Sequence, residues 1–296
     1  MQTPVKFLIS CLAVVLIAVT TLGQTTPPST DIFLIDVKHE KGRLEFGAPL
    51  NITRREGYDN QPSFLSDGRS VLYTSFRDGD QTDIYRYDIE KTTSASVTAT
   101  AESEYSPTPM QGGKYISVVR VEADSTQRLW KFPLEGGPPS LVLEKIKPVG
   151  YHVWVDDHRL MLFVLGSPNT LQMVDALTEE SETIAENIGR TLLPIPGQDK
   201  ISFLHRSGNR SIIRAFDVKT RAIIDLVEAL PGNEYYAWTP EGILLMGKDS
   251  KLFGWDPKKG GDWQQIADLS KYGIKDITRL AVSPRGDRIA LVAAHP

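Results

Sequence analysis

The chain has 296 residues, a formal net charge of −4, 41% hydrophobic residues and a single cysteine. The length permits a sizeable hydrophobic core. The mildly acidic balance without a basic run argues against nucleic acid or an acidic membrane surface as a partner, and one cysteine excludes an intramolecular disulfide framework.

The first 23 residues have the pattern of a secretory signal peptide. Lys6 is their only charge, residues 7–22 form a nearly continuous apolar run, and Gly23 precedes a short polar leader at residues 24–30. This pattern predicts cleavage after Gly23 and an exported protein, periplasmic or extracellular, with no stable membrane insertion after cleavage. A retained anchor is the alternative, disfavoured because the run is short for a membrane span. Lipidation of Cys11 is disfavoured because most of the apolar run follows it.

Residues 58–89 contain one complete structural unit. Asp67-Gly68 lies between two short apolar runs, residues 62–65 and 71–74, and an Asp-Gly pair readily adopts the positive φ of a tight hairpin. A polar run at residues 77–81 predicts a second turn, and the alternating residues 84–89 predict a third strand. With a fourth strand near residues 96–99, the unit is expected to form a small antiparallel sheet.

The same unit returns along the chain at intervals of about 40 to 45 residues. The turn pair recurs as Gly112-Gly113, Asp157-His158, Gly197-Gln198, Glu241-Gly242 and Arg285-Gly286, each followed by an apolar strand. Self-similarity at this period, with four strands per unit, is typical of β-propeller blades. We therefore predict an all-β fold, a six-bladed β-propeller formed by residues 31–296 as a single domain.

The ring is expected to close by joining the two ends of the chain. The sixth copy, at residues 280–292, has no third strand before the sequence ends. Residues 30–37 match the third strand at residues 82–89 almost position for position, and residues 49–53 supply a fourth strand. The N- and C-terminal strands are thus predicted to share one blade, which leaves no long exposed sheet edge.

These motifs resemble those of a known family. Pro62-Ser-Phe64 with Asp67-Gly68-Arg69, followed by Asp83-Ile-Tyr85, is similar to the WD40-like propeller repeat of the TolB family. The same repeat type occurs in the propeller domains of prolyl oligopeptidase-like peptidases. The resemblance implies the fold and says little about function. TolB carries an α/β domain ahead of its propeller, for which the expected leader is too short, and the peptidases' Gly-x-Ser-x-Gly nucleophile motif is absent from the sequence.

Residues just before the first strand of each copy are predicted to converge at the mouth of the ring. Tyrosine and arginine are enriched where proteins bind partners, because they bury area and form hydrogen bonds together. The alternative is that these positions are ordinary polar turns. The predicted partner-binding residues are Asn60, Tyr105, Tyr151, Arg190, Tyr235 and Arg279.

The sequence identifies no pair of carboxylates, no activated nucleophile and no metal-binding spacing of histidines. Residues 78–83 carry oxygen-bearing side chains at alternate positions, as the start of a calcium-binding loop does. The segment lacks the central glycine and the closing glutamate of such a loop. We therefore predict no catalytic residue, no metal site and no cofactor. The leading hypothesis is an exported, non-enzymatic binding or scaffold propeller that engages a protein, peptide or glycan at the ring mouth. A lyase or hydrolase that uses the central channel is the alternative, and a purely structural envelope component is a third possibility.

Overall fold

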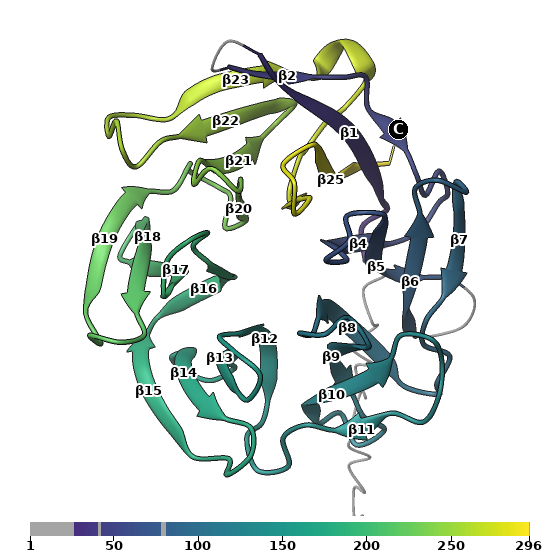
Figure 1. The fold of residues 1–296 in the computed structure, drawn as a ribbon, viewed down its shortest axis with the longest axis vertical. Helices are drawn as coiled ribbons and strands as arrows, with labels where there is room; N and C mark the ends of the chain where they lie inside the picture. Colours follow the sequence, from purple (N-terminus) through teal and green to yellow (C-terminus); the bar gives the residue numbers. More distant parts are fainter. Residues whose placement is uncertain (1–26, 41–42, 78–80, 296) are drawn as a thin grey trace, which may run out of the picture.

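The computed structural model describes residues 27–40, 43–77 and 81–295. They form six antiparallel sheets arranged around a central channel, which confirms the predicted six-bladed β-propeller (Figure 1). Within these ranges there is no α-helix, only the 3-10 helix η1 (Ser270–Tyr272), and no helix long and apolar enough to cross a membrane. The predicted signal peptide and residues 78–80 of the second turn lie outside the described residues.

Five blades are built from four consecutive strands, with the first strand beside the channel and the fourth at the rim (Figure 1). Their bounds run in chain order. Blade 1 comprises β4 (Asp59–Phe64), β5 (Ser70–Phe76), β6 (Thr82–Asp88) and β7 (Thr93–Ser96); blade 2, β8 (Ser103–Pro109), β9 (Tyr115–Val121), β10 (Gln127–Pro133) and β11 (Ser140–Leu141); blade 3, β12 (Val149–Trp154), β13 (Arg159–Val164), β14 (Thr170–Asp175) and β15 (Ser181–Glu186). Blade 4 comprises β16 (Ile188–Pro194), β17 (Lys200–Ser207), β18 (Arg210–Asp217) and β19 (Ile223–Glu228); blade 5, β20 (Tyr236–Trp238), β21 (Leu244–Lys248), β22 (Lys251–Trp255) and β23 (Gln264–Asp268).

The predicted turn after the first strand is confirmed, and the predicted fourth strand is shifted. Gly68 has φ 68°, so the Asp67-Gly68 pair makes the hairpin between β4 and β5 in the left-handed conformation that glycine accepts without strain. The fourth strand of blade 1 was expected near residues 96–99 and is instead β7, which begins at Thr93 and pairs with β6. Thr98 lies just beyond it, where its Oγ1 accepts a hydrogen bond of 2.8 Å from the Ile84 amide.

Blade 6 joins the two ends of the chain. The C-terminal strands β24 (Leu280–Val282) and β25 (Arg288–Ala294) form its inner half, and β1 (Thr30–Glu40) pairs antiparallel with β25, with Thr30 opposite Ala294. The outer position, expected at residues 49–53, is divided between β2 (Arg43–Phe46) and β3 (Leu50–Asn51), both of which pair with β1. The shared blade is therefore confirmed.

A buried carboxylate reinforces this closure. Asp31 on β1 has 0% relative exposure. It accepts hydrogen bonds of 2.8 Å from Asn51 Nδ2 and 3.0 Å from Thr53 Oγ1, and its Oδ2 lies 2.7 Å from His295 Nδ1. One side chain thus connects strands from the two ends of the described chain, and its burial is offset by these polar partners.

The hydrophobic core lies between neighbouring blades. Six clusters of buried residues occur in the described part of the chain, and each draws its members mainly from two adjacent blades. The second strand of each blade contains an unbroken run of at least four buried residues, because both of its faces pack against neighbouring sheets. In β5, residues Ser70–Ser75 are all buried. Stacked sheets of this kind bury apolar surface continuously around the ring.

Candidate functional site

All six residues predicted to converge line one pocket at an end of the channel. This mouth pocket has a volume of about 550 Å³, within the range of about 300 to 1,000 Å³ typical of ligand sites. It is lined by residues from blades 1 to 6, which only a shared central opening allows. Its lining includes Asn60, Tyr105, Tyr151, Arg190, Tyr235 and Arg279.

Most of these residues do not lie just before the first strand of their blade, as the sequence analysis predicted. Asn60, Tyr105, Tyr151 and Arg190 lie within the innermost strands β4, β8, β12 and β16, and only Tyr235 and Arg279 lie just before a strand. Each of those four strands carries an irregularity in its pairing at this point, such as the shift between Tyr105 and Thr108 in β8. Bulges increase local twist and redirect side chains, which explains how residues of a regular strand reach the channel.

Asn60 contributes less to the pocket surface than the other five. It is 7% exposed, and its Oδ1 accepts a hydrogen bond of 2.8 Å from the amide of Gln61, which has φ 56°. Its Nδ2 lies 3.5 Å from Thr30 Oγ1 on β1. Asn60 therefore helps to fix the bulge of β4 against the closing strand, and its amide is largely used within the fold.

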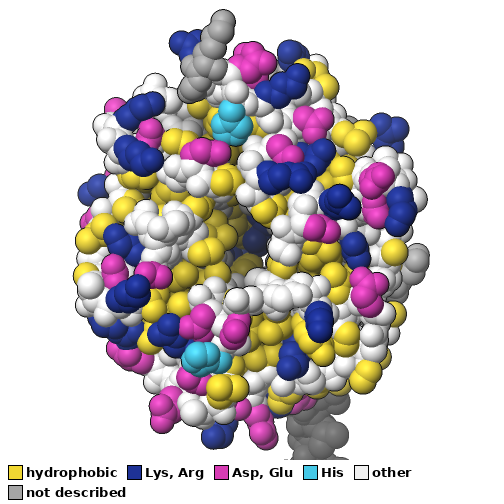
Figure 2. Space-filling model, in the orientation of Figure 1, with side chains coloured by type: hydrophobic (Ala, Val, Ile, Leu, Met, Phe, Trp, Pro, Cys, Tyr) yellow, Lys and Arg dark blue, Asp and Glu magenta, His cyan; other side chains and the backbone are white. Residues whose placement is uncertain are grey.

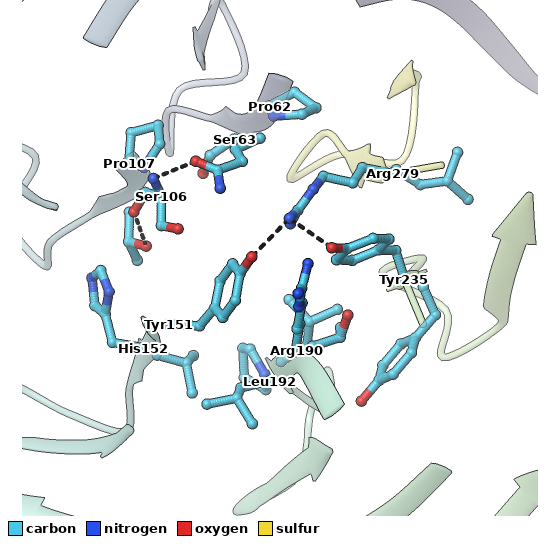
Figure 3. A pocket seen from close by; sticks show the side chains of 18 of the residues that line it. Pro62, Ser63, Ser106, Pro107, Tyr151, His152, Arg190, Leu192, Tyr235 and Arg279 are labelled. Atoms are coloured by element: carbon cyan, nitrogen blue, oxygen red, sulfur yellow. Dashed lines mark hydrogen bonds between the residues drawn. The ribbon is translucent and has the colours of Figure 1, made fainter. Parts of the chain in front are cut away.

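Arg279 is the centre of the site. Its Nη2 donates hydrogen bonds of 2.9 Å to the hydroxyl of Tyr151 and of 2.9 Å to the hydroxyl of Tyr235. Its guanidinium carbon also lies 3.8 Å from the ring centroid of Tyr235, a distance at which a cation is attracted to the aromatic face. Figure 3 shows Arg279 reaching toward both tyrosines, with Arg190 beside them.

Sequence reasoning missed Tyr58, which lines the same pocket. Burial raises the pKa of its hydroxyl, the opposing charge of Arg279 lowers it in part, and the neighbouring tyrosines raise it further. Burial likewise raises the pKa of Tyr235. Both hydroxyls therefore remain protonated at neutral pH and can donate hydrogen bonds. Tyr58 precedes the innermost strand by one residue, and the repeat alone did not show that it turns inward.

A second pocket, the throat, continues the channel beyond Arg279. It has a volume of about 330 Å³ and shares Gln61, Tyr151, Arg190, Tyr235 and Arg279 with the mouth pocket. The remaining lining is mainly apolar and proline-rich, including Pro62, Pro107, Leu192 and Trp154 (Figure 3). Figure 2 shows the central hollow with predominantly apolar walls and a basic side chain within it. The channel therefore joins a mouth that contains tyrosine, arginine and amide side chains to a throat whose further lining is mainly apolar.

The charge of the channel is opposite in sign to that of the whole protein. Among the described residues, neither pocket is lined by an aspartate or glutamate, whereas Arg190 and Arg279 line both. The polar contact of Arg190 with the Tyr235 hydroxyl raises the pKa of its guanidinium. The full chain has a formal net charge of −4, so this local excess of two cations is a specific feature of the channel.

One pair of side chains beside the throat has the composition of a serine nucleophile and its base. Ser117 Oγ lies 2.6 Å from His152 Nε2, and the direction of this hydrogen bond depends on the imidazole tautomer. Burial lowers the pKa of His152 to about 3, which makes it a poor proton acceptor at neutral pH, and its Nδ1 has no hydrogen-bond partner in the described chain. Ser117 itself has 0% relative exposure.

Ser117 also accepts a hydrogen bond from a tryptophan of the next blade, and this tryptophan–serine contact recurs at a second blade junction where the serine has no histidine partner among the described residues. Ser117 Oγ accepts a hydrogen bond of 2.9 Å from Trp154 Nε1 in the next blade, and Ser202 Oγ accepts one of 2.8 Å from Trp238 Nε1. Each serine also lies within hydrogen-bond distance of a carbonyl on its own innermost strand. The repetition indicates a structural link between blades. Trp154 and Trp238 also pack in or against the core clusters between blades, so each combines an apolar contact with this polar one.

No grouping of three or more His, Cys, Asp or Glu side chains suited to a metal ion occurs in residues 27–40, 43–77 and 81–295. Residues 78–80 of the calcium-like segment at residues 78–83 lie outside these ranges. His158 lies in the turn between β12 and β13, with its ring nitrogens 3.5 Å and 3.7 Å from carboxylates of Asp156 and Asp175. It lines neither the mouth nor the throat.

Comparisons with known proteins identify the fold. No family model and no curated protein matches the sequence. The structure is similar to that of a protein assigned as TolB from Agrobacterium tumefaciens, with a TM-score of 0.68 and 14% identity over 91% of this chain and 99% of that one. It is also similar to TolB from Acinetobacter baumannii, with a TM-score of 0.58 and 12% identity over 90% of this chain, which spans 63% of that protein.

Two further solved structures share the architecture. One is a chain in the crystal structure of a nidogen/laminin complex, with a TM-score of 0.64 and 11% identity over 90% of this chain and 99% of that one. The other is an oligogalacturonate lyase in complex with manganese, with a TM-score of 0.52 and 11% identity over 92% and 99% of the two chains. At these identities the likeness establishes the fold, which is that of TolB-like propellers, and leaves function to the site.

Proposed function

We propose that the protein is an exported, non-enzymatic binding module that holds a partner at the mouth pocket. The observation that carries this proposal is the convergence of four tyrosines and two arginines on one concave opening. Tyrosine and arginine supply large contact area and hydrogen bonds at low entropic cost, and such residues dominate binding hot spots. The nidogen/laminin complex, named for two proteins, supports a protein or peptide as the partner more than a glycan.

The enzyme hypothesis remains the second candidate, because one structure with this fold is that of a lyase. An enzyme that uses the channel needs a group that transfers protons near neutral pH. The described lining of the mouth and throat offers no carboxylate, and its histidine, His152, is buried with a pKa of about 3. These features favour binding over catalysis.

Export rests on the sequence pattern of residues 1–23. We expect the mature protein to begin near Gln24 and to be recovered outside the cytoplasm. Intact-mass measurement of material from the native host tests this. A full-length chain in the membrane fraction, or a lipid on Cys11, would show the export proposal to be wrong.

Site-specific photo-crosslinking tests the binding face. A photoreactive phenylalanine analogue in place of Tyr105 should crosslink a partner from an extract of exported proteins of the native host. The matched control carries the same analogue in place of Gln111, which is exposed in the hairpin at the opposite end of β8. Equal crosslinking from both positions, or crosslinking from Gln111 alone, would place the binding surface elsewhere.

A double variant measures how much two of the mouth tyrosines contribute to the affinity for the partner. Replacing Tyr105 and Tyr235 by alanine should weaken partner binding at least tenfold, because losing one hot-spot residue typically costs about 2 kcal/mol and about 1.4 kcal/mol is a factor of ten. Tyr105 packs against the core cluster between blades 2 and 3, so its replacement can also lower stability. The melting temperature of the variant is therefore measured in parallel.

A further inference from the structure

The mouth pocket holds two guanidinium groups, and no carboxylate is among the described residues that line it. Arg279 donates a hydrogen bond to the Tyr235 hydroxyl, and Arg190 lies beside the same tyrosine in both pockets (Figure 3). Like charges at short range repel, and partial burial strengthens the repulsion because solvent screening is reduced. Glu234 lines neither the mouth nor the throat. It is ion-paired with Arg206 and lines a neighbouring pocket together with Arg190. An anion placed between the two arginines would relieve this repulsion.

Arg279 is also held in position with donors to spare. Its Nη2 makes both of its hydrogen bonds, to Tyr151 and Tyr235. Its Nε and Nη1 make no hydrogen bond to residues in the described ranges, although the guanidinium carries five N–H donors in a fixed fork. The two tyrosines thus orient the group from one side. Because Nη2 belongs to both edges of the guanidinium that can form a two-bond fork, the donors left on Nε and Nη1 each suit one oxygen of an anion. A carboxylate held by both oxygens therefore needs a second donor, which Arg190 can supply.

The apolar throat begins at the same arginine. Pro62, Pro107 and Leu192 line it directly beyond the residues that both pockets share. A ligand that fits both regions carries its negative charge immediately beside an apolar group. The end of a polypeptide chain has this arrangement, because its terminal carboxylate and its last side chain share one carbon atom.

On this basis we propose that the mouth binds the C-terminal carboxylate of a peptide or protein segment whose last side chain is apolar. Arg279 and Arg190 hold the carboxylate, the hydroxyls of Tyr58 and Tyr105 donate to it or to the neighbouring peptide group, and the last side chain enters the throat. The inference rests on the proposed binding function and specifies the chemistry of the partner. It requires no conformational change, since the donors already face one opening.

The test uses two mixtures of acetylated tripeptides that contain only neutral residues. One mixture ends in a free carboxylate and the other in an amide, so the terminal charge is the single difference. Binding to the folded protein is followed by saturation-transfer NMR, and affinities of the best binders are measured by calorimetry. We expect free-acid peptides with an apolar last residue to bind at least tenfold more tightly than their amides. Equal binding of both mixtures, or binding of neither, overturns the proposal.

Three variants test whether Arg279 causes the preference for peptides with a free carboxylate. Arg279→Gln should remove the preference for the free acid, Arg279→Lys should restore part of it, and Arg69→Gln should leave it unchanged. Arg69 is exposed in the hairpin between β4 and β5 and its loss changes the net charge equally. Arg190→Gln provides a second channel variant, should Arg279→Gln fail to fold. An unchanged preference in a folded Arg279→Gln or Arg190→Gln protein contradicts the assignment.

Competition distinguishes other sources of the anion. Inorganic phosphate and a galacturonic acid trimer are added to the protein in place of the peptides. If either binds in a manner that depends on Arg279 while the free-acid peptides do not, the channel is an anion site and the peptide assignment is wrong. If the peptides bind and displace these compounds, the assignment stands.

Partner capture separates this inference from the broader proposal. In one outcome the double variant Tyr105→Ala/Tyr235→Ala captures less partner, Arg279→Gln captures as much as the wild type, and amidated peptides bind as tightly as the free acids. The mouth then binds a partner without using a carboxylate. If neither set of variants affects capture, the mouth is not the binding face.

Discussion

The guanidinium of Arg279 in blade 6 donates a hydrogen bond of 2.9 Å to the hydroxyl of Tyr151 in blade 3, the blade opposite in the ring. The contact joins residues 128 positions apart in the chain and crosses the channel between the mouth and the throat. Because the second acceptor, Tyr235, belongs to blade 5, three blades determine where the cation lies. The site is thus a property of the closed ring.

Removing the Tyr151 hydroxyl should affect binding more than stability. In Tyr151→Phe the ring still packs edge-on against Phe163, whose centroid is 5.7 Å away, while Arg279 loses one of its two acceptors. A hydrogen bond of this kind contributes about 0.5 to 1.5 kcal/mol. We expect a fall in affinity for the best free-acid peptide of about three- to tenfold, measured by calorimetry, and a small change in melting temperature. Tyr115→Phe, at an exposed position on β9, is the control.

The closing strand should be indispensable. Deleting residues 24–40 removes β1, exposes the edge of β25 and uncovers apolar residues of the clusters on either side of blade 6. We expect the variant to aggregate or to melt at a much lower temperature, because an unpaired edge strand is a template for association. Deleting only residues 24–28 retains all of β1 and serves as the control. A monomeric 24–40 deletion with an unchanged melting temperature, by light scattering and calorimetry, would disprove the closure.

The two serines at blade junctions should be equivalent and structural. Ser117→Ala leaves the half-buried Trp154 N–H without its acceptor, and Ser202→Ala does the same to the buried Trp238 N–H. An orphaned buried polar group costs about 1 to 3 kcal/mol. We expect both variants to lose stability by similar amounts in urea titrations, and Ser66→Ala, at an exposed turn position, to lose little. Covalent labelling of Ser117 by a fluorophosphonate probe would instead indicate a nucleophile and favour the enzyme hypothesis.

Stability should depend on pH through Glu104. This carboxyl has 0% relative exposure, and burial raises its pKa to about 7, although hydrogen bonds from Thr100 and Thr98 and the charge of Arg120 oppose the rise. The folded state therefore binds the proton more tightly than the unfolded chain does. The contribution of Glu104 to the stability of the folded state is fully present below about pH 4.5, the usual pKa of glutamate. It is lost as pH rises through about 7.

The variant Glu104→Gln isolates this effect. A rise in pKa from 4.5 to about 7 corresponds to roughly 3 kcal/mol. The wild-type protein should lose roughly that much more stability than Glu104→Gln between pH 5 and 8, by urea titration. His152 acts in the opposite direction, because burial lowers its pKa to about 3. Its contribution to stability is lost as pH falls below about 6.5. This effect is the same in the wild type and in Glu104→Gln, so it cancels in the comparison. Parallel pH profiles for the two proteins would contradict the prediction.

The repeat made the fold predictable from sequence. Asp67-Gly68 and its five counterparts mark hairpins that need only local backbone preferences, and the apolar strands that follow them report burial on both faces. The match between residues 30–37 and residues 82–89 then required that the N-terminal strand complete the last blade. Equivalent positions around a ring share a neighbourhood, so the six mouth residues were also found together.

Tertiary structure decided what the repeat could not show. Tyr58 lines the mouth from a bridge with Thr30 of the closing strand, and Asn60 is used within the fold at a bulge of β4. The link from Trp154 to Ser117 and the contact of Arg279 with Tyr151 join side chains of different blades. Each repeat of the sequence folds according to the same local backbone preferences. Sequence periodicity therefore shows which residues occupy equivalent places in different blades. Distances across a channel depend on ring closure and on side-chain direction, and these are fixed only when all six blades pack together.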